Sequence, residues 1–156
     1  MQSDEAGFTK AVICRITAPL LPILIQVINL KFKEYFICFG IGAFAYGLIE
    51  IAVRGYTHWT MALTGGLVLV ILNAVNKNKK LGLISRCLIG AAVITGLEFT
   101  VGMIVNVGLG WNVWDYSEKP FNLFGQICPF FSIGWFFLSI PAYFICSQIE
   151  KRVSLR

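Results

Sequence analysis

Charged side chains are scarce in this chain. Of its 156 residues, 13% are charged and 57% are hydrophobic, whereas a soluble domain carries roughly 25% charged residues. The few charges are also separated by long apolar runs. These features exclude an ordinary soluble domain and predict a membrane protein that crosses the bilayer several times.

Motifs for metal, nucleotide and covalent chemistry are missing as well. The chain has a single histidine, no CxxC pair, no P-loop and no recognisable serine or cysteine nucleophile motif. We therefore expect no metal and no cofactor, and any coupling to ATP would need a separate subunit. Its five cysteines lie in or beside apolar runs and are expected to act as small buried hydrophobes. The first ten residues, MQSDEAGFTK, do not resemble a secretory signal peptide.

The net charge of +5 does not predict a nucleic-acid partner, because the basic residues fall between the apolar runs. A bilayer core of about 30 Å needs about 20 mostly apolar helical residues. Four runs meet this requirement: between Glu34 and Arg54, from Trp59 to Asn76, between Arg86 and Asp115, and between Lys119 and Glu150. A shorter run, Ile16 to Leu30, contains two prolines and could be a kinked first span or an interfacial segment, and a span is favoured.

The expected fold is thus all-α, with about five transmembrane helices in a single domain over residues 1–156. A short tail would occupy residues 1–10 and a short basic tail residues 150–156. Positive residues favour the cytoplasmic side of a membrane. With five spans, nine basic residues lie on one side and four on the other, which predicts a cytoplasmic C-terminus and an extracytoplasmic N-terminus.

Two stretches suggest an internal repeat. YGLIEIAVRGYTHWTM (46–61) and TGLEFTVGMIVNVGLGWNVWDYS (95–117) each contain Gly-Leu, a nearby glutamate, a glycine and a tryptophan-bearing loop. The returning helices would carry Gly65-Gly66 and Gly125-Gln126. A parallel repeat of two helical hairpins would place Glu50 and Glu98 opposite each other, in one shared site.

The polar residues near the expected spans gather toward the extracytoplasmic half. Glu98 is expected near mid-membrane, where a carboxylate is costly. Glu50 and Arg54 are spaced as an i,i+4 ion pair, and His58 would follow one turn later if the helix continued past Gly55. The remaining candidates lie near the last outer loop, with Gln126 expected just inside the following helix: Asn106, Trp114, Asp115, Tyr116, Asn122 and Gln126.

Each of these residues also has a structural interpretation. Glu50–Arg54 could be an ion pair at a helix end, and Glu98 and the amides could be hydrogen-bonding groups between helices. His58 could be a boundary residue, and the tryptophans and Tyr116 could form an aromatic belt.

The segments EIAVRGYTHWTMALTGG and LGWNVWDYSEKPFNLFGQICPFFSIGW resemble the two signature regions of a bacterial family, the ABC-transporter type IV or permease-like membrane proteins. The resemblance covers roughly residues 35–147, and it implies a role in transport. The matching positions are Glu50, Arg54, His58, Trp59, Glu98, Asn106, Trp114, Asp115, Tyr116, Asn122 and Gln126.

The leading hypothesis is a multi-pass cell-membrane protein that binds a small polar or amphipathic molecule in an outward-facing cavity for transport. Glu98 and Glu50 would be the deep acidic groups, while Arg54 and His58 would hold an anionic group or relay protons. A homodimer or another membrane subunit would complete the pathway.

One rival is an intramembrane acid–base enzyme acting on a lipid or isoprenoid, with Glu50, His58 and Glu98 as catalytic candidates. Another is an assembly subunit whose polar groups bind a partner helix.

Overall fold

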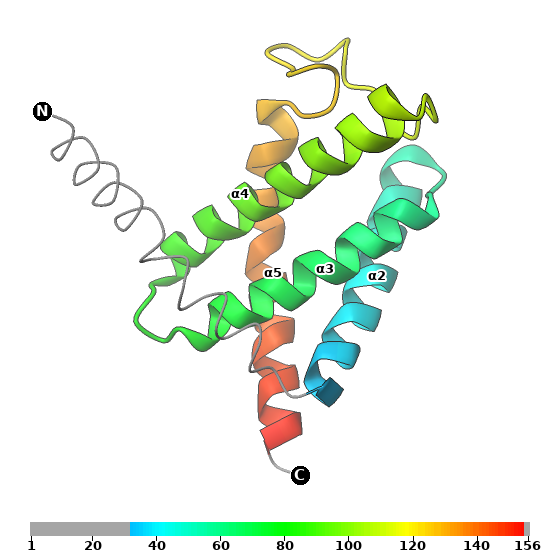
Figure 1. Cartoon of the computed structure of the whole chain (residues 1–156). Coiled ribbons are helices and arrows are strands. Elements are labelled where there is room, and N and C mark those ends of the chain that lie inside the picture. The colour runs from blue at the N-terminus through cyan, green and yellow to red at the C-terminus, as the bar shows by residue number, and fades with distance from the viewer. Residues whose placement is uncertain (1–31, 155–156) are drawn as a thin grey trace, which may run out of the picture. The chain divides into compact units, whose positions relative to one another are not determined.

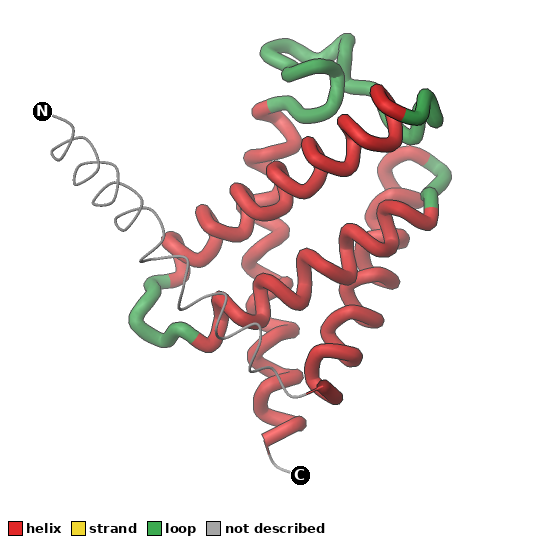
Figure 2. Tube along the Cα trace, viewed as in Figure 1, coloured by secondary structure: helices red, strands yellow, loops and turns green. Residues whose placement is uncertain are grey.

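A computed structural model describes residues 32–154, which belong to a compact unit over Lys31–Arg156. Four long helices and one π-helical turn make up the regular structure of these residues (Figures 1 and 2). They are α2 (Phe32–Arg54), α3 (Trp59–Lys77), α4 (Leu83–Gly102), η1 (Met103–Gly108) and α5 (Pro129–Ser154).

Four of the described helices are long and apolar enough to cross a membrane, which confirms the four long spans predicted from the sequence. The chain is therefore an all-helical membrane protein over its described residues. The shorter run expected as a first span, Ile16 to Leu30, lies outside them.

A tight turn separates α2 from α3. Gly55 has a positive φ of 79°, and its N–H donates to the carbonyl of Ile51 at 2.8 Å, so α2 ends at Arg54. His58 is the N-cap of α3, and its ring Nδ1 accepts a hydrogen bond from the backbone N–H of Thr60. His58 thus starts the next helix and does not extend the Glu50–Arg54 face by another turn.

The last helix begins later than the sequence predicts. Pro129 is the first residue of α5, a position where proline is favoured because its missing N–H needs no partner. Gln126 lies in the preceding loop, so its expected place inside the helix is wrong. Gly65 and Gly66 lie within α3, whereas Gly125 lies in this loop, so the returning helices do not carry matching glycines. The internal repeat is not confirmed.

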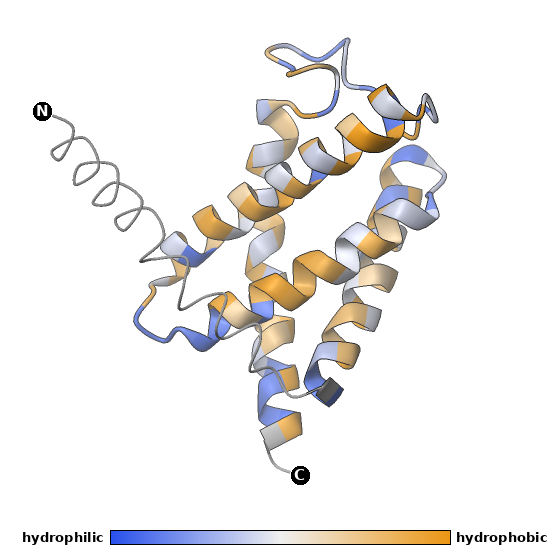
Figure 3. Cartoon of the chain, viewed as in Figure 1, coloured by the Kyte–Doolittle hydropathy of each residue, from blue (hydrophilic) through white to orange (hydrophobic). Residues whose placement is uncertain are grey.

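The central helix of the bundle is α3. Its most apolar stretch is 72% buried, against 22–28% for the corresponding stretches of the other three spans. Close approach to α2 depends on small residues, because a Cβ on Gly65 would collide with Tyr46 and with the carbonyl oxygen of Gly42. Figure 3 shows that apolar residues extend along all four helices, as lipid-facing surfaces require.

We call the end of the bundle where α2 begins and α5 ends the basic end, and the opposite end, with residues 109–128, the loop end. At the basic end, the buried carboxylate of Glu34 accepts hydrogen bonds from Asn73 (2.9 Å) and Lys77 (3.1 Å). These contacts join α2 to α3. No polar site was expected at this end from the sequence.

A second polar network joins α3, α4 and α5 at the same end. Asn76 accepts from Arg86 at 2.7 Å and donates to Ser147 at 3.1 Å. Glu150 accepts from Lys79 at 2.9 Å, and the hydroxyl of Tyr143 donates to the carbonyl of Arg86 at 2.7 Å. In both networks the side chains bind partners within the protein, and these contacts hold the helix ends together.

Substituting Gly65→Ala should destabilise the protein by about 1–3 kcal/mol, because the added methyl group overpacks the α2–α3 contact. Gly40→Ala on α2 is the matched control, since a Cβ there meets nothing within 4 Å. Unfolding of both variants in mixed micelles, followed by circular dichroism, measures the difference. Equal stability of the two variants would contradict the close packing of these helices.

Candidate functional site

Glu98 is the most deeply placed acidic residue of the described spans. Its side chain on α4 is only 2% exposed. The hydroxyl of Tyr46, on α2, donates to Oε1 at 2.6 Å, and the indole N–H of Trp135, on α5, donates to Oε2 at 2.7 Å. One carboxylate therefore joins three helices through two short hydrogen bonds.

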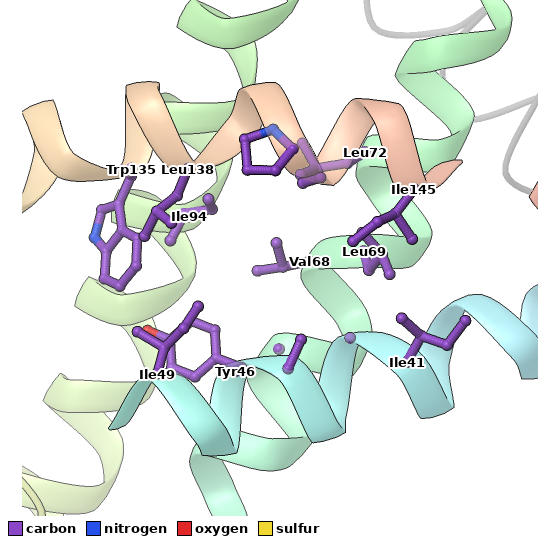
Figure 4. A pocket seen from close by; sticks show the side chains of 15 residues that line it. Ile41, Tyr46, Ile49, Val68, Leu69, Leu72, Ile94, Trp135, Leu138 and Ile145 are labelled. Carbon is purple, nitrogen blue, oxygen red and sulfur yellow. The ribbon is translucent and has the colours of Figure 1, made fainter. Parts of the chain in front are cut away.

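The two donors also contact each other. The rings of Tyr46 and Trp135 are stacked, with centroids 5.6 Å apart and planes inclined by 25°. They stand at one edge of a cavity of about 130 Å³ that is lined by residues of all four helices, which we call the central cavity (Figure 4). Apart from the tyrosine hydroxyl and the indole nitrogen, the side chains that face it are apolar.

A second space of about 90 Å³, the loop-end pocket, is also lined by Trp135. Its wall includes Glu50, Arg54 and Tyr116, and it shares Ile49, Trp135 and Leu138 with the central cavity. Both spaces therefore lie along the seam between α2 and α5. Trp135 lines both of them and holds Glu98 at the same time.

Glu50 and Arg54 form the i,i+4 ion pair that their spacing predicts, and Glu50 is buried. Arg54 also donates to the carbonyl of Val113 at 3.2 Å, and its guanidinium lies over the ring of Tyr56. Both charges of the pair lie close enough to Glu98 to interact with it electrostatically. The arrangement brings Glu50, Arg54 and Glu98 into one region.

Tyr116 joins this region from the loop. Its buried ring stacks on Phe131 of α5, with centroids 4.5 Å apart, and faces the loop-end pocket. Burial raises the pKa of Tyr116 well above its usual range, and the nearby Glu98 carboxylate raises it further. At neutral pH Tyr116 thus presents a neutral hydroxyl.

Three other predicted residues build the loop. Asn106, in η1, donates to Gln126 Oε1 at 2.7 Å and accepts from the backbone N–H of Val113 at 2.7 Å. The indole N–H of Trp114 donates to the carbonyl of Gln126 at 2.9 Å. All three side chains are buried, and their contacts fix the loop over the helix ends.

Asp115 and Asn122 make their hydrogen bonds within the turns of the loop. Asp115 accepts from the hydroxyl and the backbone N–H of Ser117, and these bonds lower its pKa. Asn122 donates to the carbonyls of Ser117 and Lys119, both at 2.9 Å. These contacts are typical of side chains that shape turns.

His58 belongs to an aromatic group at the start of α3. Its ring lies 5.5 Å from the rings of both Trp59 and Trp111, measured between centroids. Together with its capping bond to Thr60, this places His58 beside the loop in a helix-capping role.

Sequence reasoning missed Tyr46 and Trp135. A buried carboxylate in a membrane needs donors from neighbouring helices, and few tyrosines and tryptophans lie inside the spans. A search for such donors would have found both residues. Within residues 32–154, no three His, Cys, Asp or Glu side chains come together as metal ligands.

At alkaline pH, the free energy of unfolding should depend on the ionisation of the Tyr116 hydroxyl. Its raised pKa means that the folded state keeps the proton more tightly than the unfolded chain, where tyrosine has a pKa of about 10. The stabilisation is complete below that value and is lost as pH rises toward the folded-state pKa. Above about pH 9.5, wild type should lose free energy of unfolding faster than Tyr116→Phe. If denaturant titrations show that wild type and Tyr116→Phe lose free energy of unfolding equally with rising pH, the burial of this hydroxyl is contradicted.

Comparison with known proteins identifies a family. A family model described as "Putative ABC-transporter type IV" covers residues 39–155, a range that includes Tyr46, Glu98, Trp135 and the whole loop. No curated protein and no solved structure matches the chain. The match confirms the resemblance inferred from the two signature segments. The chain belongs to the putative ABC-transporter type IV family.

Proposed function

We propose that this protein is a permease-like membrane protein that binds a small amphipathic molecule between α2 and α5 and moves it across the membrane. The observation that carries this proposal is the position of the Glu98 carboxylate. It is held by Tyr46, which lines the central cavity, and by Trp135, which lines both the central cavity and the loop-end pocket. The family match supports a transport role.

The two spaces suit the two parts of an amphipathic molecule. The apolar central cavity would hold its hydrocarbon part, and the region of Glu50, Arg54 and Tyr116 would hold its polar head. The cavity of about 130 Å³ is smaller than the several hundred cubic ångströms typical of ligand pockets. Binding would therefore require α2 and α5 to separate, which opens the Tyr46–Glu98–Trp135 contact.

The same proposal sets the orientation. The loop end would face the extracytoplasmic side of the cell membrane, so that the site opens outward, and the basic end with the C-terminus would face the cytoplasm. Ile16 to Leu30 would add a fifth span, and a homodimer or another subunit would complete the pathway. An acid–base enzyme is less favoured, because Glu98 and Glu50 are both engaged by donors of the described chain.

Flux measurements on liposomes containing the full chain test the role of Glu98. The probes are fluorescent amphiphiles of one chain length with anionic, cationic or neutral heads. Liposomes with the wild-type protein should transport one class of probe faster than empty liposomes do. Glu98→Gln should slow this flux at least about tenfold, which corresponds to a free-energy difference of about 1.4 kcal/mol. Glu118→Gln, in the exposed loop, is the matched control and should keep the wild-type rate.

Binding is measured separately, with spin-labelled versions of the same probes that quench tryptophan fluorescence. Trp135 lines both spaces, so Trp135→Phe should remove part of the quenching. Circular dichroism checks that each variant is folded. Absence of any flux above that of empty liposomes, or equal rates for Glu98→Gln and Glu118→Gln, would contradict the proposed function.

A further inference from the structure

A larger groove opens between α2 and α5 at the basic end, and we call it the basic-end groove. Its volume is about 720 Å³, within the range of ligand sites. Lys33 on α2, together with Gln148 and Arg152 on α5, supplies its polar rim, and Ile37 and Phe144 are among its apolar walls. Glu50, Glu98 and Trp135 do not line this groove.

The two cations of the groove have no ion-pair partner among the described residues. The acids nearby in the bundle are already engaged. Glu34 binds Lys77, and Glu150 binds Lys79. Both Lys33 and Arg152 are exposed, so the groove carries two positive charges that the described chain does not neutralise.

The apolar part of the groove continues toward the middle of the bundle. Ile41 and Ile145 line both the basic-end groove and the central cavity. Phe144 is 65% exposed and Ile37 is 39% exposed, so apolar surface lies next to the cations on the outside of the bundle. Positive charge at the helix ends, followed by apolar surface toward mid-membrane, matches the order of headgroup and acyl chain in a phospholipid.

We propose that the basic-end groove binds one anionic glycerophospholipid. Its phosphate lies between Lys33 and Arg152, where bidentate contact with the guanidinium is available. One acyl chain follows Ile37 and Phe144 toward Ile41 and Ile145. Basic pockets between transmembrane helices on the cytoplasmic side are suited to anionic headgroups, and each Lys or Arg near a membrane surface strengthens the attraction. This lipid site shares with the proposed function only the orientation that puts the basic end at the cytoplasmic face, and it does not require transport.

Native mass spectrometry of the full chain in a neutral detergent tests the proposal. The probes are phosphatidylglycerol and phosphatidylcholine with identical acyl chains. Wild type should retain one phosphatidylglycerol in preference to phosphatidylcholine. The double variant Lys33→Gln/Arg152→Gln should bind it about 30-fold more weakly, because two headgroup contacts are lost.

Lys80→Gln/Lys151→Gln is the matched control. It removes the same two charges from the same end, but neither residue lines the groove. This control should bind phosphatidylglycerol as wild type does. Ile37→Trp fills the apolar part without changing the charge, and it should also weaken binding. Both results together would support a site in the groove, since a loss of general surface attraction would affect the two charge pairs equally.

Three results would overturn the proposal. Equal weakening by the two double variants would assign the binding to net charge alone. Equal retention of phosphatidylglycerol and phosphatidylcholine by wild type would show that Lys33 and Arg152 do not select an anionic headgroup. A lipid-free dimer that Ile37→Trp dissociates would make the groove an interface between two copies of the chain. Lipid retention by Lys33→Gln/Arg152→Gln and flux through Glu98→Gln are separate measurements on different variants, so either proposal can fail while the other stands.

Discussion

The hydrogen bonding of Glu98 is the constraint on which the rest of the structure depends. The Glu98 side chain is almost fully buried, and leaving the oxygens of a buried carboxylate without donors costs at least about 1–3 kcal/mol. Tyr46 and Trp135 supply those donors from α2 and α5. Because α4 carries the acid, α2, α4 and α5 must each turn toward one point the face that bears Tyr46, Glu98 or Trp135. Their rotation about their own axes follows from this requirement.

The space between α2 and α5 follows from the same contact. The two helices meet at Glu98 through long side chains, and α3 fills the centre of the bundle. Pro141 lies inside α5 and lines the central cavity. A proline there removes a backbone hydrogen bond and favours a bend. The charge along the seam between α2 and α5 differs at its two ends. At the loop end, Glu50 pairs with Arg54 and the charges cancel. At the basic end, Lys33 and Arg152 have no ion-pair partner among the described residues, so the seam is positively charged there.

The four long spans, the Glu50–Arg54 pair and the burial of Glu98 could be predicted, because each depends on local spacing or on the cost of charge in lipid. The donors Tyr46 and Trp135 lie 52 and 37 residues from Glu98, so their contacts depend on how the helices pack. The roles of Asn106 and Gln126 depend on a loop path that begins with a π-helical turn, which hydropathy does not reveal. At the basic end, Asn73 and Asn76 were overlooked because topology alone explained the charges beside them.

A double-mutant cycle between Tyr46→Phe and Glu98→Leu tests the central claim most directly. The free energy of unfolding is measured in mixed micelles for wild type, both single variants and the double variant. If the tyrosine hydroxyl binds the buried carboxylate, the two changes should be coupled by about 1–2 kcal/mol, within the range for contacting residues. Additive effects, equal within about 0.3 kcal/mol, would show that the residues do not interact and would contradict the account of how α2, α4 and α5 are held together.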